Sequence, residues 1–226
     1  MKVSIIIPVY NEYKTIGKII AAVERTQFGV DKELIIVDDC STDGTRAVLR
    51  QYETLHKVIY HGRNLGKGAA LKTGFASATG DYIINQDADL EYDPADHALL
   101  VEPILKSQAE VVFGSRLLDP AKNAYIYRRY LWGGIVLNHI VNIVAGTRVN
   151  DIFSGSKLFP RAALAKFSLD SNGFEIETEL TIKLARAGYN ILEVPISYKA
   201  RTIAEGKKIR PHHAFKILKT AFKSRL

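Results

Sequence analysis

Three acidic side chains at every second position are the residues of this chain best suited to chemistry. Asp87, Asp89 and Glu91 directly follow the apolar run at residues 82–84. In an extended segment alternate side chains point the same way, so we expect these carboxylates to converge on one cation. Carboxylates this close raise one another's pKa unless a metal ion lies among them. The spacing therefore predicts a hard divalent cation that holds a phosphate-bearing ligand.

The same residues have a purely structural alternative. Asp93-Pro94 follows the carboxylates and is typical of a helix start, with Asp93 as the cap and Pro94 at the first helical position. The acidic segment could then be a turn between a strand and a helix. Two aspartates separated by one residue are a weak motif alone, so the neighbouring segments must decide between a metal site and a structural turn.

Length and composition favour one large α/β domain. The chain has 226 residues, and its 47% hydrophobic content suffices for a core without disulfides. The single cysteine, Cys40, cannot form an internal disulfide, which favours a reducing compartment. The apolar run at residues 3–7 is too short for a signal peptide, so we interpret it as a buried first strand.

Apolar β-branched runs alternate with amphipathic segments over the first half of the chain. The pattern predicts strands at 3–10, 33–37, 57–60, 82–85 and 111–114, and helices at about 15–25, 45–52, 68–78 and 94–107. Such alternation is typical of crossover units, so we expect a mostly parallel sheet with helices on both faces.

Polar residues follow four of these strands. They are Tyr10-Asn11-Glu12, Asp38-Asp39, the turn at 63–68 and the carboxylates at 87–91. Ligands of parallel sheets bind at the carboxyl ends of the strands, so all four segments are expected at one binding site.

Two of these segments suit a nucleotide. Asp39 can accept hydrogen bonds from a base or a ribose, whereas Ser41 or Asp43 can cap the next helix. The glycine-flanked basic turn around Lys67 opens a helix and suits an anion. The chain lacks GxxxxGK[ST], and no GxGxxG follows its first strand, which argues against NTPases and dinucleotide-binding proteins.

Ordered motifs along nearly the whole chain resemble the family 2 glycosyltransferases. They are Pro8-Val9-Tyr10-Asn11-Glu12, Val37-Asp38-Asp39, Asn64-Leu65-Gly66-Lys67-Gly68, Gln86-Asp87-Ala88-Asp89-Leu90-Glu91, Gly114-Ser115-Arg116, the segments 151–157 and 173–177, Glu193-Val194-Pro195-Ile196 and the segment 201–208. The closest resemblance is to the polyprenyl-phosphate group typified by dolichol-phosphate mannose synthase. It implies an α/β fold of the GT-A (Rossmann-like) type, with amphipathic helices near the C-terminus.

The resemblance also implies roles for single residues. Pro8, Tyr10, Glu12 and Asp39 would hold the nucleoside of a GDP- or UDP-sugar, with Lys67 and Lys207 at the same donor. Asp87, Asp89 and Glu91 would bind Mg²⁺ or Mn²⁺ at the donor diphosphate; many mannose synthases of this group have Gln where this chain has Glu91. Arg116 and Arg201 would lie near the donor diphosphate or the acceptor phosphate.

The acceptor decides what catalysis requires. A sugar hydroxyl would need a general base, for which Asp151 is the first candidate. A lipid monophosphate needs none, because its second pKa of about 6 leaves an anionic oxygen at neutral pH. We therefore expect single displacement with inversion at the anomeric carbon, with Asp89, Arg116 and Arg201 stabilising the departing diphosphate.

The C-terminal segment carries the excess charge of the chain. Residues 207–226 hold seven basic and no acidic residues, whereas residues 1–206 balance at 24 basic and 24 acidic. From Ala214 onward Phe215, Leu218 and Phe222 share a helical face beside a row of lysines, so we expect a domain at 1–210 and a basic amphipathic helix at 211–226. The helix suits an anionic membrane surface, or it docks on the domain with solvated lysines. A nucleic-acid partner lacks a supporting motif.

Residues 125–146 are the expected acceptor region. Tyr125, Tyr127, Tyr130 and Trp132 suit a membrane interface, and the helix at 135–144, too short to cross a bilayer, could cover a prenyl chain. Asn138, His139 and Asn142 are expected on one packed polar face. The resulting prediction is a peripheral enzyme on the cytoplasmic face of a membrane, alone or with a separate membrane-anchored partner.

Three other activities remain open from the residues. A transferase acting on a sugar hydroxyl would need the same donor site. A nucleotidyltransferase that makes nucleotide sugars also uses carboxylate-bound Mg²⁺, but usually has a glycine-rich loop where this chain has Pro8-Val9-Tyr10-Asn11-Glu12. The third is a non-catalytic nucleotide-sensing module at a membrane.

Overall fold

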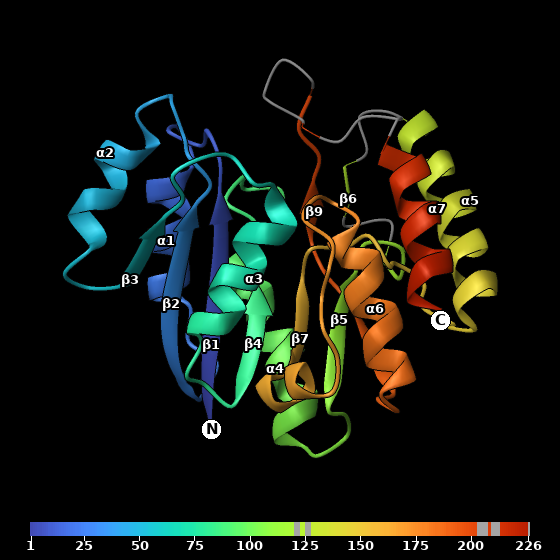
Figure 1. The fold of residues 1–226 in the computed structure, drawn as a ribbon. Helices are drawn as coiled ribbons and strands as arrows, with labels where there is room; N and C mark the ends of the chain where they lie inside the picture. Colours follow the sequence, from blue (N-terminus) through green and yellow to red (C-terminus); the bar gives the residue numbers. More distant parts are fainter. Residues whose placement is uncertain (120–122, 125–127, 203–207, 209–212, 226) are drawn as a thin grey trace.

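A seven-stranded sheet forms the centre of the protein (Figure 1). The computed structural model describes residues 1–119, 123–124, 128–202, 208 and 213–225. The strand order is β3-β2-β1-β4-β7-β5-β8, and β7 is antiparallel to both β4 and β5, whereas the other pairs are parallel. The strands are β1 (Lys2–Val9), β2 (Asp31–Asp38), β3 (Lys57–Tyr60), β4 (Tyr82–Asn85), β5 (Val111–Ser115), β7 (Lys157–Pro160) and β8 (Ile191–Pro195). A small second sheet pairs β6 (Asn123–Ala124) with β9 (Tyr198–Lys199).

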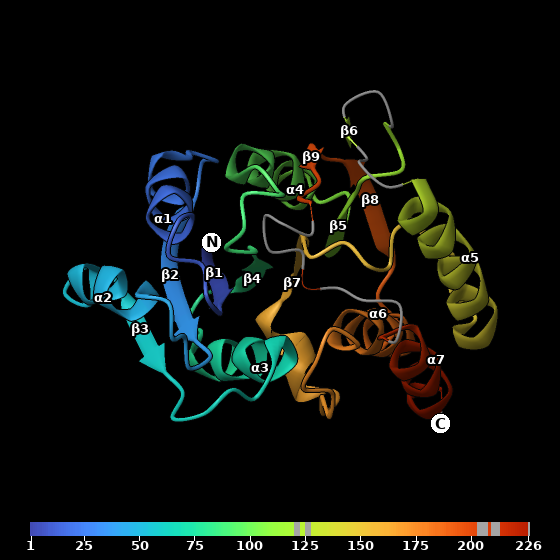
Figure 2. The same ribbon diagram turned by 90° about the horizontal axis from the view of Figure 1, so that it is seen from above.

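Helices cover both faces of the central sheet (Figure 2). Side chains alternate across a strand, so Ile5 and Ile7 of β1 join one hydrophobic cluster and Ile6 joins the other. The first cluster lies under α1 (Ile16–Arg25), α2 (Thr45–Leu49) and α4 (His97–Leu105), and the second under α3 (Lys67–Ser77) and α6 (Ile176–Arg186). Helix α7 (His213–Ser224) packs against both α6 and α5 (Arg128–Ala145).

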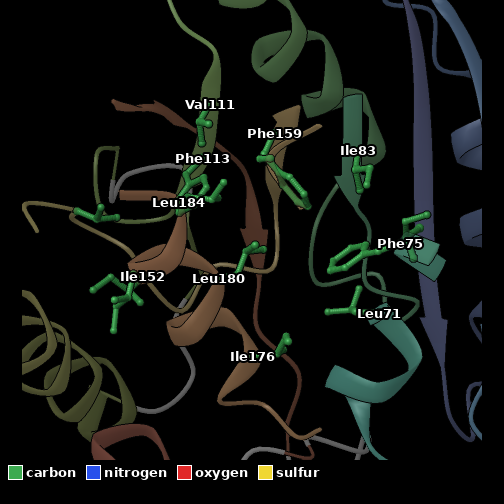
Figure 3. Close-up of a cluster of buried hydrophobic side chains, with 14 of the residues drawn as sticks. Leu71, Phe75, Ile83, Val111, Phe113, Ile152, Phe159, Ile176, Leu180 and Leu184 are labelled. Atoms are coloured by element: carbon green, nitrogen blue, oxygen red, sulfur yellow. The ribbon is translucent and has the colours of Figure 1, made fainter. Parts of the chain in front are cut away.

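The second cluster ties the two halves of the sheet together (Figure 3). Phe75 of α3 packs edge-on against Phe159 of β7, with ring centroids 5.6 Å apart. Each fully buried side chain of this size contributes about 1.5–3 kcal/mol. Gly74 allows α3 to approach β1 closely, because a Cβ there would lie 2.2 Å from Cγ2 of Ile6.

The predicted elements of the first half are confirmed within a few residues. The segment 45–52 is α2 followed by a 3₁₀ turn at Arg50–Tyr52, and the segment 94–107 is a 3₁₀ turn at Pro94–Asp96 followed by α4. Asp93 accepts a hydrogen bond of 2.9 Å from the Ala95 amide, as expected of a cap before Pro94. The sheet and its flanking helices confirm the predicted α/β class.

Helix α7 confirms the amphipathic helix predicted near the C-terminus. Ile217 and Ala221 are buried in the second hydrophobic cluster, whereas Phe215 is 76% and Phe222 is 57% exposed. The helix therefore docks on the domain and still presents apolar side chains outward. The proposed division at residue 210 stays a prediction, since residues 209–212 lie outside the described part of the chain.

Candidate active site

One cavity of about 1220 Å³ receives the predicted site residues that the structure describes. Its position at the carboxyl ends of β1, β2, β4 and β5 follows from the parallel arrangement of these strands. The predicted residues that line it are Pro8, Tyr10, Glu12, Asp39, Lys67, Asp87, Asp89, Glu91, Arg116, Asp151 and Arg201. Lys207 lies outside the described residues.

The acidic segment after β4 is a turn and not an extended strand. Strand β4 ends at Asn85, and Leu90 has a left-handed backbone with φ of 62°. The carboxylates of Asp87, Asp89 and Glu91 consequently face different partners. Within residues 1–119 and the other described ranges, no group of three acidic, His or Cys side chains is arranged to hold a metal ion. The extended backbone on which the expected convergence rested is thus absent.

Asp89 is paired with a cation from a distant part of the chain. Nη2 of Arg201 lies 3.0 Å from Oδ2 of Asp89, and the same guanidinium contacts both carboxylate oxygens of Glu12 at 3.1 and 3.2 Å. Lys208 also contacts Glu12, with Nζ 2.7 Å from Oε1. Burial, together with the charges of Asp87 and Glu91, raises the pKa of Asp89 to about 7 against the opposing charge of Arg201.

Glu91 anchors the segment that carries Arg201. Its Oε1 accepts a hydrogen bond of 2.7 Å from the Arg201 amide, and its Oε2 accepts one of 3.1 Å from the Tyr198 hydroxyl. The backbone carbonyl of Glu91 accepts a further bond from the Lys199 amide at 2.9 Å. The Glu91 side chain therefore fixes where the backbone of Arg201 lies.

A divalent cation fits the chemistry of this donor set. Asp89, Asp87 and Glu91 supply only carboxylate oxygens, which Mg²⁺ and Mn²⁺ prefer, and Arg201 neutralises Asp89 in the absence of such a cation. The assignment of the three carboxylates as metal ligands stays a prediction.

Asp39 orders the turn between β3 and α3. Its Oδ1 accepts the Leu65 amide at 2.8 Å and its Oδ2 accepts the Gly66 amide at 2.7 Å. His61, which the sequence did not single out, lies with Nδ1 2.8 Å from Oδ1 of Asp39 and Nε2 2.9 Å from the Thr73 hydroxyl. Asp39 thus has a structural task beside its predicted contact with the nucleoside.

Lys67 is held between two carboxylates. Its Nζ lies 2.7 Å from Oδ1 of Asp87 and 3.1 Å from Oε1 of Glu177. Burial lowers the pKa of Lys67, but the charges of Asp87 and Glu177 outweigh it and hold that pKa above its ordinary value. The predicted contact of Lys67 with the donor is untested, and its ammonium charge is shared by these two neighbours.

Arg116 and Asp151 form a buried bidentate pair. Nε and Nη2 of Arg116 each lie 2.7 Å from a different oxygen of Asp151, and the Arg116 amide donates to Oδ2 at 3.0 Å. Burial raises the pKa of Asp151, but the Arg116 guanidinium outweighs it and keeps that pKa below its ordinary value. Arg116 also lies over the Tyr198 ring, 4.9 Å from its centroid. Both oxygens of Asp151 are therefore occupied.

Apolar residues of α5, α7 and the 153–174 region line the other end of the cavity. They include Ile135, Val136, Leu137, Ile140, Phe153, Phe174 and Ile217. Asn138 is buried on α5 and accepts the Ile152 amide at 2.8 Å, and Asn142 bonds to Val149 in the same loop. His139 is exposed, so the expectation that it shares their packed face is wrong, because adjacent helical residues differ in direction.

A family model decides what kind of protein has this site. The model described as Glycosyl transferase family 2 matches residues 4–167. The chain belongs to glycosyl transferase family 2. This membership favours a glycosyltransferase over the nucleotidyltransferase and the non-catalytic module considered from the sequence.

Named relatives of this family 2 chain act on dolichol derivatives. It is 29% identical over 211 residues to the dolichol-phosphate mannosyltransferase of Pyrococcus furiosus, a match that covers 92% of this chain and 59% of that relative. It is 30% identical over 229 residues to the UDP-N-acetylglucosamine--dolichyl-phosphate N-acetylglucosaminyltransferase of Methanococcus voltae, covering 91% and 89%. The chain thus spans about three fifths of the first relative and most of the second.

Solved structures confirm the GT-A fold of this family 2 chain. Glucosyl-3-phosphoglycerate synthase from Mycobacterium tuberculosis, in complex with phosphoglyceric acid, superimposes with a TM-score of 0.75 at 21% identity, covering 99% of this chain and 79% of that one. The same enzyme in complex with Mn²⁺, uridine diphosphate and phosphoglyceric acid gives 0.74 at 22% identity.

Proposed function

We propose that this protein transfers a sugar from a GDP- or UDP-sugar to a polyprenyl phosphate at a membrane surface, with inversion and with Mg²⁺ or Mn²⁺. The observation that carries the proposal is the single cavity that joins a charged end to an apolar end. A nucleotide sugar suits the first and a lipid chain suits the second. The names of the relatives from P. furiosus and M. voltae support a dolichyl-type acceptor.

The charged end suits the donor. Pro8, Tyr10, Glu12 and Asp39 would hold the nucleoside. Asp89, with Asp87 and Glu91, would hold the divalent cation, which when bound neutralises charge on the diphosphate leaving group. The M. tuberculosis neighbour, crystallised with Mn²⁺ and uridine diphosphate, supports such a donor site in this fold.

The arrangement of Asp151 favours a phosphate acceptor over a hydroxyl. A general base must reach the proton that it removes, and both oxygens of Asp151 are bound by Arg116. A phosphate monoester brings an oxygen that is already anionic, so alignment beside Arg116 and Arg201 suffices. Arg116, fixed by Asp151, would orient the acceptor phosphate.

Helices α5 and α7 present an apolar surface suited to a lipid bilayer. Its exposed side chains are Trp132, Val136, Ile143, Phe215 and Phe222, which are between 57% and 76% exposed. Lys216 and Lys219 are exposed on α7, so the same end of the molecule offers positive charge to anionic lipid. None of the helices in the described residues is both long and apolar enough to cross a membrane.

A panel of substrates tests the function. The protein would be incubated with Mn²⁺, GDP- and UDP-sugars and a short polyprenyl phosphate, with the unphosphorylated polyprenol as the matched control. Transfer to the phosphate and not to the alcohol is the expected result. Transfer to the alcohol, or no transfer to the lipid phosphate with any donor, would overturn the acceptor assignment.

A further inference from the structure

Four alternating charges form a chain that starts at the wall of the cavity, which Asp87, Lys67 and Glu177 line, and ends at buried Lys157. Asp87 pairs with Lys67, Lys67 with Glu177, and Glu177 with Lys157, whose Nζ lies 2.6 Å from Oε2 of Glu177. Lys157 is fully buried, and Glu177 is 4% exposed. The proposed reaction assigns no task to Glu177 or Lys157.

Lys157, the last residue in this chain of charges, holds the loop that carries Asp151. Nζ of Lys157 donates to the carbonyl of Ile152 at 3.0 Å and also to the carbonyl of Ser154. Asp151 directly precedes Ile152 and binds Arg116 at the end of β5. The chain of contacts therefore runs from Asp87 after β4 to the Asp151–Arg116 pair.

The sheet topology explains why such a link is needed. Strand β7 lies between β4 and β5, so Asp87 and Arg116 come from strands that are not neighbours. Because β7 is antiparallel, its first residue, Lys157, lies at the edge where β4 and β5 end. Gly155 allows the loop before β7 to approach Asp87 and Lys67 closely, since a Cβ there would lie 2.6 Å from Oδ2 of Asp87 and 3.3 Å from Nζ of Lys67.

Stability alone does not account for these buried charges. Replacing a buried ion pair by apolar residues of similar size is often neutral or stabilising, although removing one partner is costly. A chain of fixed charges does supply defined distances between the groups at its two ends.

We propose that Lys67, Glu177 and Lys157 are positioning residues that set the donor-side carboxylate Asp87 relative to the acceptor-side pair Asp151–Arg116. This inference rests on the proposed function, in which the phosphate at Arg116 attacks the sugar of the donor held beside Asp87. A loosened link leaves donor binding intact but misaligns the attack. Water then competes better with the acceptor for the sugar.

The test compares the double variant Glu177→Gln/Lys157→Met with the wild type. The double variant removes one charge of each sign and leaves Lys67 paired with Asp87. We expect kcat for transfer to fall by about tenfold to about 100-fold, the range for a misplaced reacting group, with donor KM changed by less than about threefold. The ratio of donor hydrolysed to sugar transferred should rise, and amide exchange at Ser154 and Gly155 should accelerate.

The matched control is Glu179→Gln on the same helix. Glu179 is also buried, but it accepts the Asp170 and Ser171 amides and lies outside the charge chain. This control should leave the hydrolysis ratio unchanged. A wild-type ratio and kcat in the folded double variant would overturn the inference.

Two further outcomes are decisive. If the double variant does not fold, Glu177→Asp keeps both charges and shortens the link by one methylene; an unchanged hydrolysis ratio there overturns the inference. If the wild type transfers to no lipid phosphate, the proposed function fails separately. Exchange at Ser154 and Gly155 still reports on the link, and wild-type exchange rates in the variant contradict it.

Discussion

The guanidinium of Arg201 lies 3.0 Å from Asp89 and also pairs with Glu12, although these residues are far apart in the sequence. A positive side chain thus lies against a carboxylate that is predicted to bind a divalent cation. Because Glu91 holds the Arg201 amide, the guanidinium can leave Asp89 while its backbone stays in place. The arrangement suggests that Arg201 and the metal ion compete for Asp89.

Removing this competition should strengthen metal binding. We expect Arg201→Gln to bind Mn²⁺ without nucleotide about tenfold more tightly, a difference of about 1.4 kcal/mol, while transfer becomes slower. Titration of Mn²⁺ followed by electron paramagnetic resonance measures this. Arg46→Gln, which breaks a pair with buried Asp38, is the matched control and should not change the affinity. Equal or weaker Mn²⁺ binding by Arg201→Gln would contradict the competition.

The pH dependence of transfer should be insensitive to Asp151. If Asp151 orients Arg116, Asp151→Asn lowers kcat but leaves the acidic limb of the pH–rate profile where it is in the wild type. If Asp151 is instead a general base for a hydroxyl, the variant loses that limb. Profiles of kcat/KM between about pH 5 and pH 8 distinguish the two roles.

His97 should make the fold sensitive to acid. It is buried beside Gln86, with Nε2 2.8 Å from Oε1, and burial together with the charge of Lys32 lowers its pKa to about 3. Below the unfolded value of about 6.5 the unfolded chain binds a proton that the folded chain does not, so stability is lost as pH falls.

The measurement for His97 is urea unfolding at several pH values. Between about pH 6 and pH 4 the free energy of unfolding should fall by about 1.4 kcal/mol per pH unit more in the wild type than in His97→Gln. Parallel pH dependences of the two proteins would show that His97 titrates normally in the folded state.

The exposed phenylalanines of α7 should contribute to membrane binding. We expect Phe215→Ser/Phe222→Ser to lose most flotation with vesicles of phosphatidylglycerol and phosphatidylcholine, because both rings are removed from the lipid-facing surface. Leu55→Ser, at a residue 69% exposed on another part of the molecule, should float like the wild type. Equal flotation of all three proteins would remove α7 from the membrane role.

The sequence predicted the sheet and the strand-end residues because both follow from local patterns. Apolar runs and helix periods identify β1 to β5, and the carboxyl ends of parallel strands necessarily bring Glu12, Asp39 and Asp89 to one edge. Strand β7 was missed because its first residue, Lys157, is charged yet fully buried. Nothing local to Lys157 reveals Glu177, its partner from α6.

Local sequence patterns also could not predict the geometry of the acidic turn. The alternate spacing implied convergence only if the backbone were extended, and the left-handed conformation of Leu90 prevents that. The pairing of Asp89 with Arg201 depends on β9, which places the distant segment next to Glu91. Contacts of this kind are set by the tertiary fold.

Phosphorus nuclear magnetic resonance of the product tests the central claim, inverting transfer of a sugar to a lipid phosphate, most directly. The protein would be supplied with Mn²⁺, a donor whose sugar carries ¹³C at the anomeric carbon, and a short polyprenyl phosphate. The account predicts that the phosphate monoester becomes a diester whose phosphorus couples to that carbon, with the anomeric configuration inverted. A product with the configuration retained, or release of the donor sugar while the phosphate remains a monoester, would contradict it.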